Sequence, residues 1–130
     1  MVLIRYVLPV VMLVHGLAHL PGLVTAWRLQ QLPDFPYHTV LLRGRLDVGD
    51  GGMRVVGALW LIAALGFGVA AIAAFLGEPR WLLVGMVTTV LSSVLCLLEW
   101  PFARVGLWVN LALLAGLAAT ARFSASWVPR

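Results

Sequence analysis

Apolar residues dominate the chain in four long runs, separated by shorter polar stretches. The runs lie at residues 6–27, 55–76, 81–98 and 105–121. A helix needs about 20 largely apolar residues to cross a bilayer, and a backbone in lipid must satisfy its own hydrogen bonds, so each run is predicted to be a helix. The turns at residues 77–80 and 99–104 are short, so the last three helices should be antiparallel neighbours.

We therefore expect one all-α domain over residues 1–130, an integral membrane four-helix bundle with up-down antiparallel order. A long extramembrane loop, residues 28–54, connects the first two helices. Residues 24–26 resemble a signal-peptidase site. The apolar run before them is long and is interrupted by two histidines and a proline, which predicts that the first helix is retained.

Composition supports a membrane protein. The chain is 62% hydrophobic and 11% charged, with a mean hydropathy of +1.01. An average soluble domain is about 45–50% apolar and about 25% charged. A soluble fold of this size could not bury so much apolar surface, and disordered chains are poor in apolar residues. The lipid bilayer is therefore the first expected partner.

All the basic residues are arginines, which outnumber the acids by nine to five and give a net charge of +4. The chain has no basic stripe or RNA-binding motif, so nucleic acid is not expected as a partner. The predicted faces carry Arg5, Arg80, Arg122 and Arg130 on one side and Arg28, Arg43, Arg45, Arg54 and Arg104 on the other. Four against five is no bias under the positive-inside rule, so charge does not orient the bundle.

The sharpest departure from the apolar pattern is the segment HGLAHLPG, residues 15–22. His15 falls near the middle of the first span and His19 lies one turn closer to the long loop, so both rings share a helix face. Ionisable groups at membrane depth are uncommon and mostly face the bundle interior. Pro21 is predicted to bend the helix or to free a carbonyl group.

Three roles are open for this histidine pair. Each ring can hydrogen-bond across the bundle, contact a ligand or substrate, or ligate a metal or haem. Two histidines do not complete a zinc site, and no acid lies on the same helix. No cofactor is therefore predicted, and haem or metal binding by His15 and His19 is the least favoured of the three roles. Cys96 is the only cysteine, which excludes an intramolecular disulfide and CxxC chemistry.

The third span carries small and polar residues at helical spacing, so they line one side of the helix. These residues are Gly85, Thr89, Ser92, Cys96 and Glu99. Small residues permit close helix packing, and hydroxyl groups can bond to their own helix. The alternative is a polar wall that faces the histidine pair.

Three further side chains are candidates to join that wall. Asn110 lies two turns inside the last span, and Trp60 and Trp108 lie several residues inside their helices. Trp27, Trp81, Trp100 and Trp127 instead fit an aromatic belt at the membrane interfaces. We expect a ligand pocket that opens toward the long loop. Its predicted residues are His15, His19, Trp60, Thr89, Ser92, Cys96, Trp108 and Asn110.

The long loop carries charged side chains next to this expected pocket. Arg43, Arg45 and Asp47 are predicted to form ion pairs over the mouth of the pocket or to contact lipid head groups. Asp50 is predicted to cap the N-terminus of the second helix. The segment lacks the pattern of a calcium loop or a phosphate-binding loop.

These residues resemble the motifs of a group of small bacterial four-helix membrane proteins of unknown function, broadly similar to DoxX-like bundles. Residues 15–22 match an HGxxHxxG pattern, residues 57–63 match GxLWLxA, and residues 106–110 match GxxxN. The likeness covers nearly the whole chain except the long loop. It implies the four-helix fold and a bacterial inner membrane with both termini cytoplasmic, but it carries no catalytic role.

Two classes of function follow. The lack of a complete catalytic constellation favours a non-enzymatic protein that holds a lipophilic small molecule, or an accessory subunit of a membrane complex or homo-oligomer. The alternative is a membrane-embedded enzyme of isomerase or cyclase type, with His15 or His19 as the base and Glu99 or Asp47 as the acid. That alternative requires an acid within hydrogen-bond reach of a histidine or of a shared ligand.

Overall fold

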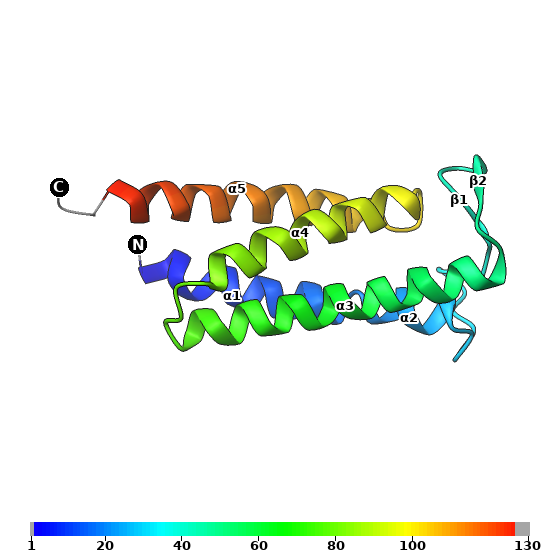
Figure 1. The fold of residues 1–130 in the computed structure, drawn as a ribbon, viewed down its shortest axis with the longest axis horizontal. Helices are drawn as coiled ribbons and strands as arrows, with labels where there is room; N and C mark the ends of the chain where they lie inside the picture. The colour runs from blue at the N-terminus through cyan, green and yellow to red at the C-terminus, as the bar shows by residue number, and fades with distance from the viewer. Residues whose placement is uncertain (1, 127–130) are drawn as a thin grey trace.

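The computed structural model describes residues 2–126 (Figure 1). The elements in chain order are α1 (Val2–Leu17), α2 (Leu20–Ala26), β1 (Val40–Leu41), β2 (Leu46–Asp47), α3 (Gly49–Phe75), α4 (Trp81–Leu98) and α5 (Arg104–Ser126). Two residues discussed above lie outside the described residues. They are Trp127, which was assigned to an aromatic belt, and Arg130, which was counted among the arginines of one face.

Four stretches of helix are long and apolar enough to cross a membrane, which confirms the expected helical fold of a membrane protein. They are Ile4–Ala26, Gly49–Phe75, Trp81–Leu98 and Arg104–Ser124. The first of them comprises α1 and α2 together. The two short strands pair antiparallel in a small hairpin inside the long loop, which an all-α prediction did not include.

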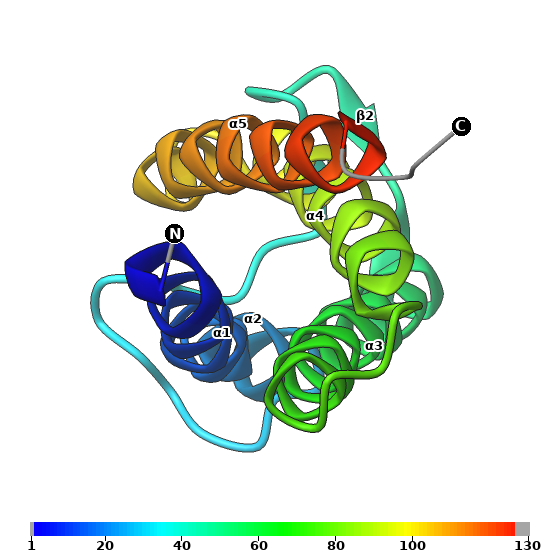
Figure 2. The same cartoon turned by 90° about the vertical axis from the view of Figure 1, so that its left-hand side faces the viewer.

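The helices form a ring around the core, seen end-on in Figure 2. In this ring α1 and α2 pack on α3, α3 packs on α4, and α4 packs on α5. The ring closes between α5 and α1, and these two helices touch each other much less than the other neighbours do. The loop and hairpin lie at the end of the bundle opposite the chain termini (Figure 1).

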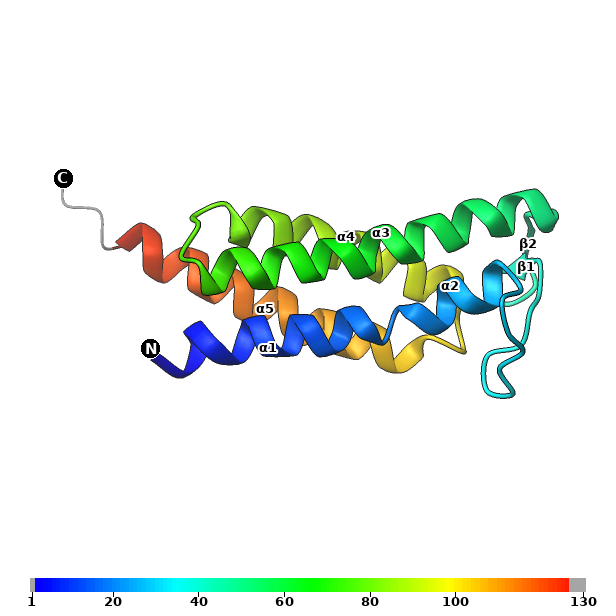
Figure 3. The ribbon, with the colours of Figure 1, turned by 90° about the horizontal axis from the view of Figure 1, so that it is seen from below.

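The first span is divided at its histidines, where the sequence predicted one helix over residues 6–27. The backbone N–H of His19 bonds to the carbonyl of Gly16 at 3.1 Å instead of to that of His15. Pro21 then occupies the first turn of α2, where its missing N–H costs nothing. Figure 3 shows the step between α1 and α2. The break leaves the carbonyl of His15 without its helical partner.

Helix α3 starts at Gly49, six residues before residue 55, where the second span was predicted to start. The long loop is shorter in consequence. Asp50 is not the N-cap: Val48 holds that position without a side-chain cap, and Asp50 lies in the first turn. Its carboxylate accepts hydrogen bonds from Arg28 and Tyr37. A negative charge in the first turn is favourable for the helix dipole.

Glycines of the family-like motifs make room for particular side chains. A Cβ on Gly22 would lie 2.5 Å from the indole of Trp60, and one on Gly106 would lie 2.9 Å from Cys96 Sγ. A Cβ on Gly57 would in the same way lie too close to the indole of Trp27. Glycine is required at these three positions because side chains from other segments pack directly against the backbone there.

Candidate functional site

Four polar side chains inside the bundle are joined in a closed hydrogen-bonded ring, which we call the polar cycle. Nε2 of His15 lies 2.7 Å from Oδ1 of Asn110, and Nδ2 of Asn110 lies 2.8 Å from Oγ of Ser92. Oγ of Ser92 lies 2.6 Å from Nε2 of His19. Nδ1 of His19 then lies 2.7 Å from the carbonyl oxygen of His15, which closes the ring.

The carbonyl of His15 fixes the direction of every bond in the polar cycle. A carbonyl only accepts, so Nδ1 of His19 carries the proton and Nε2 of the neutral ring is an acceptor. The hydroxyl of Ser92 therefore donates to His19 and accepts from the amide N–H of Asn110. The amide oxygen of Asn110 in turn accepts from Nε2–H of His15. The helix break at His19 thus sets the protonation of both histidines.

One acceptor of the polar cycle stays open. Because Nε2 of His15 holds the proton, Nδ1 of the neutral ring presents a lone pair, and no described residue hydrogen-bonds to it. The fully buried polar side-chain atoms without a partner are Trp60 Nε1 and Glu99 Oε1, and Nδ1 of His15 is not among them. The residue His15 itself is among those that line a cavity.

That cavity, which we call the loop-end cavity, has a volume of about 810 Å³. It lies along the seam between α1 and α5, under the first part of the long loop. Its polar lining consists of His15, His19, Asp34, Trp60 and the thiol of Cys96. Its apolar walls are Val10, Val11, Val14, Ala18, Pro21, Gly22, Leu32, Pro33, Phe35, Phe102, Ala103, Val105, Gly106 and Val109.

Aromatic rings pack in sequence along one wall of this cavity. The ring of His19 lies 4.7 Å from that of His15 and 5.1 Å from that of Trp60, centroid to centroid and edge to face. Phe67 closes the other side of both histidines, at 5.1 and 5.3 Å. The two imidazoles are therefore held by packing as well as by hydrogen bonds, which is the arrangement that fixes a binding group.

Glu99 does not contact the histidine pair. Its Oε2 lies 2.7 Å from Nε2 of His38, a loop residue whose Nδ1 donates to the carbonyl of Pro36 at 2.8 Å. Since that carbonyl only accepts, a single proton remains between Nε2 and Oε2, and the pair is neutral overall whichever atom holds it. Asp47 lies in the exposed hairpin and accepts only from the backbone of Gly49.

Glu99 is buried, with only 1% of the residue exposed. Burial raises the pKa of the Glu99 carboxyl, and the neighbouring His38 and the indole N–H of Trp60 oppose part of this rise. The indole N–H nevertheless makes no hydrogen bond of normal geometry, and neither does Oε1 of Glu99. The two groups leave one unpaired donor and one unpaired acceptor at the loop end of the bundle.

The structure brings six of the eight predicted pocket residues together. His15, His19, Trp60 and Cys96 line the cavity, and Ser92 and Asn110 lie behind them in the polar cycle. The other two lie elsewhere. Thr89 is buried but donates to the carbonyl of Gly85 in its own helix. Trp108 is 66% exposed and points away from the bundle, so its predicted place in the pocket is not met.

The loop covers the cavity with a different segment from the one predicted. Arg43, Arg45 and Asp47 are exposed and are not among the lining residues. The lining comes from Leu32 to Phe35, which lie earlier in the loop. The apolar Leu32, before Pro33, and Phe35, between Pro33 and Pro36, were the available signal for this contact, since large apolar side chains are more often buried than exposed. His38 as the partner of Glu99 was also missed.

Among the described residues, no three His, Cys, Asp or Glu side chains gather as a metal site would require. Nε2 of each intramembrane histidine is already hydrogen-bonded within the polar cycle. This leaves Nδ1 of His15 as the one ring nitrogen of the pair available to a ligand, and a single nitrogen is not a metal centre.

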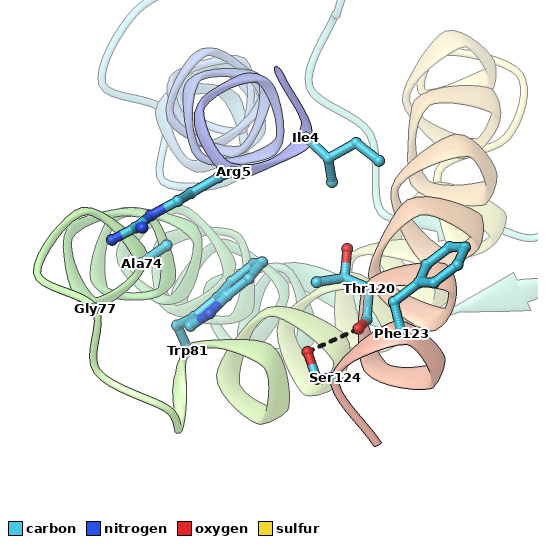
Figure 4. Close-up of a pocket in the computed structure, with 8 residues that line it drawn as sticks. All are labelled: Ile4, Arg5, Ala74, Gly77, Trp81, Thr120, Phe123 and Ser124. Carbon is cyan, nitrogen blue, oxygen red and sulfur yellow. Dashed lines mark hydrogen bonds between the residues drawn. The ribbon is translucent and has the colours of Figure 1, made fainter. Parts of the chain in front are cut away.

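A second cavity, which we call the terminal cavity, lies at the opposite end of the bundle and has a volume of about 600 Å³. Figure 4 shows Arg5 extending from α1 toward α3, with the indole of Trp81 projecting between α1 and α5. The lining residues are Ile4, Arg5, Ala74, Gly77, Trp81, Thr120, Phe123 and Ser124. The hydroxyl of Ser124 donates to the carbonyl of Thr120 in its own helix and is exposed, unlike the buried side chains of the polar cycle.

Comparisons with known proteins leave the geometry as the guide to function. No protein-family model matches the chain, and neither a curated protein nor a solved structure matches it.

Proposed function

We propose that the protein binds a lipophilic molecule in the loop-end cavity, with the polar end of that molecule at His15. The observation that carries the proposal is His15, which lines an otherwise mostly apolar cavity of about 810 Å³ and whose Nδ1 has no hydrogen-bond partner among the described residues. Pockets for small molecules typically have about 300–1,000 Å³ and a few fixed polar groups among apolar walls. The polar cycle holds His15 in one tautomer and one orientation.

Access from the bilayer supports this assignment. The cavity follows the α1–α5 seam, where these helices touch least. Val10, Val14 and Val105 line it and are 50%, 63% and 69% exposed. In a bilayer these side chains would meet acyl chains, so an apolar ligand can enter sideways without crossing water. This is the expected route for a molecule that partitions into lipid.

The test is native mass spectrometry of the full chain released from lipid nanodiscs. We expect one bound molecule per chain, lost in most of the population in a His15→Phe variant. Ser93→Ala is the matched control, because Ser93 donates only to the carbonyl of Thr89 in its own helix. Equal retention by both variants would overturn the proposal. A co-purifying protein in place of a small molecule would favour an accessory subunit instead.

We also propose a location for the chain, which rests on the resemblance to small bacterial four-helix proteins. In a bacterial inner membrane with both termini cytoplasmic, the loop-end cavity would lie in the periplasmic half of the bilayer. A cysteine introduced at Asp34, which is exposed at the cavity mouth, would then react with an impermeant maleimide added to intact cells. A cysteine at the exposed Glu78, in the turn at the other end, would not.

A further inference from the structure

A buried hydrogen bond holds the first part of the long loop against the end of α4. Nε2 of His38 lies 2.7 Å from Oε2 of Glu99, and Nδ1 of the same ring donates to the carbonyl of Pro36 at 2.8 Å. The side chain of Glu99 is fully buried, whereas 22% of the His38 side chain is exposed. We call the His38–Glu99 pair, with the proton that its two residues share, the loop clamp.

The ring of His38 also packs against residues that line the loop-end cavity. Its centroid lies 5.1 Å from that of Phe102 and 6.3 Å from that of Phe35, and the rings of Phe35 and Phe102 lie 5.6 Å apart. Both phenylalanines line the cavity, and Phe35 belongs to residues 32–35, which we call the cover segment. A displacement of His38 therefore loosens the cavity wall.

The carbonyl of Pro36 makes the loop clamp depend on one proton. Because Nδ1 of His38 donates to that carbonyl, its Nε2 either holds the shared proton or accepts it from Glu99. When this proton is lost, the lone pair of Nε2 faces a charged oxygen, and a buried carboxylate without a partner is strongly unfavourable. A second proton has a different effect, since Nε2–H of a charged ring can still donate to a neutral carboxyl group.

The other charged and titratable side chains near this end of the bundle are exposed or hydrogen-bonded elsewhere. Those that are exposed are Arg104 at the start of α5, Asp34 in the cover segment, and Arg43, Arg45 and Asp47 in the hairpin. Those that are bonded elsewhere are His19 of α2, Cys96 of α4, and Tyr37 of the loop. Burial raises the pKa of the Glu99 carboxyl, and His38 is the charged group that opposes this rise.

We propose that the loop clamp is a pH switch for access to the loop-end cavity. The cover segment is held closed while the pair keeps its proton. As pH rises, the proton leaves to water through the partly exposed ring of His38, and the segment opens. The backbone bond from Leu42 to the carbonyl of Leu98 anchors the next part of the loop, which confines the movement to the residues before it. Release of a bound molecule by this route rests on the proposed function, but the movement of the loop does not.

Amide hydrogen exchange of the full chain in lipid nanodiscs tests the movement without any ligand. Exchange in residues 32–38 is measured between about pH 5 and about pH 9, on both sides of the ordinary histidine range. Each rate is divided by the intrinsic rate at the same pH to give a protection factor. We expect wild-type protection in this segment to fall by about tenfold as pH rises, the change that corresponds to about 1.4 kcal/mol.

Variants separate the proton from the packing. Glu99→Gln can donate its amide N–H to the neutral ring of His38 at any pH, so its protection factors should stay high across the series. His38→Phe keeps an aromatic ring next to Phe35 and Phe102 without the clamp, and its protection should be low at both ends. Asp34→Asn is the matched control, because it removes an exposed carboxylate from the same segment. It should follow wild type.

Cys96 reports on the cavity itself, because it lines the cavity and is the only cysteine of the chain. A cationic methanethiosulfonate reagent is excluded from the acyl region of the bilayer, so it reaches this thiol from the loop end. At about pH 9 it should modify wild type about tenfold faster than Glu99→Gln, and at about pH 5 equally fast. The ratio of the two rates cancels the pH dependence of the thiol.

The outcomes keep this inference separate from the proposed function. Wild-type protection that does not change with pH, or that changes equally in Glu99→Gln, would overturn the switch. Faster exchange without faster modification of Cys96 would overturn its role in access to the cavity. Neither result decides whether a lipophilic molecule binds at His15, since the retention experiment with His15→Phe tests that on its own.

Discussion

At the scale of single residues, the polar cycle explains how the bundle tolerates two histidines at membrane depth. Each ring nitrogen that faces protein has a hydrogen-bond partner. Both rings are neutral in this pattern, so no charge is buried. Nδ1 of His15 has no hydrogen-bond partner among the described residues, which leaves its lone pair for the ligand that we propose.

Ser92 should be the most sensitive member of the cycle, because it donates to His19 and accepts from Asn110. Ser92→Ala leaves Nε2 of His19 without a partner, at about 1–3 kcal/mol, and leaves Nδ2 of Asn110 with only the thiol of Cys96 among the described residues, so it should lower the midpoint of thermal unfolding in detergent. Ser93→Ala, one residue along, should have little effect since its hydroxyl bonds only to its own helix. Similar midpoints for the two variants would contradict the cycle.

Glu99 should make stability depend on pH. Its pKa is raised in the folded state by burial, so its contribution is fully present below the unfolded pKa and is lost as pH rises through the folded pKa. Glu99→Gln removes this titration. The unfolding midpoint of the variant should therefore improve relative to wild type as pH rises above about 4.3, the ordinary pKa of a glutamate.

Glu78→Gln is the control for this measurement, because Glu78 is exposed in the turn between α3 and α4. Its unfolding midpoint should run parallel to that of wild type across the pH series. If the difference in unfolding midpoint between Glu99→Gln and wild type does not change with pH, the carboxyl of Glu99 has the same pKa in the folded and unfolded states, which would contradict the prediction.

At the scale of helices, the apolar pattern predicted the four spans well and their ends less well. The third span, Trp81–Leu98, has the predicted bounds because charged or proline residues flank it closely. The start of α3 was missed because Gly49 to Arg54 contain two charged residues and three glycines, yet the helix extends beyond the hydrophobic run. Pro21 predicted a distortion, but the hydrogen bond between the carbonyl of His15 and the ring of His19 follows from side-chain geometry that spacing does not contain.

Gly22 tests the packing of these helices directly. A Cβ at this position would lie 2.5 Å from the indole of Trp60, so Gly22→Ala must displace that ring. We expect a loss of about 1–3 kcal/mol from overpacking, and weaker retention of the molecule bound in the loop-end cavity because Trp60 lines it. Gly68→Ala has open space around it and should be neutral or slightly stabilising. Equal stability of the two variants would rule out the close contact.

At the scale of the whole molecule, the ring of helices has its weakest contact at the α1–α5 seam, and the loop covers one end of that seam. Sequence reasoning placed the pocket beneath the loop from the histidines, Ser92 and Asn110. It assigned the cover to Arg43, Arg45 and Asp47 because they are charged, whereas Leu32 and Phe35 line the cavity. Which part of a long loop folds back depends on contacts between distant residues, such as Thr25 with Phe35, and no local pattern encodes them.

The hydrogen bond from Thr25 to Phe35 should therefore control how firmly the loop closes the cavity. The hydroxyl of Thr25, a residue only 2% exposed, donates to the carbonyl of Phe35 at 2.9 Å. Thr25→Val keeps the shape and removes this bond, whose net contribution is about 1 kcal/mol. Amide hydrogen exchange in residues 32–36 should accelerate by a factor of about 5, the change that 1 kcal/mol produces through local opening.

Thr39→Val provides the comparison within the same loop, because no described group hydrogen-bonds to the Thr39 side chain and the bond from Val48 to the Thr39 backbone is kept. Exchange in residues 32–36 should match wild type in this variant. The molecule bound in the loop-end cavity should also dissociate faster from Thr25→Val than from Thr39→Val, since the loosened segment includes Leu32 and Phe35 of the cavity wall. Faster exchange with unchanged dissociation would mean that the ligand leaves through the α1–α5 seam alone and that the loop is only a cover.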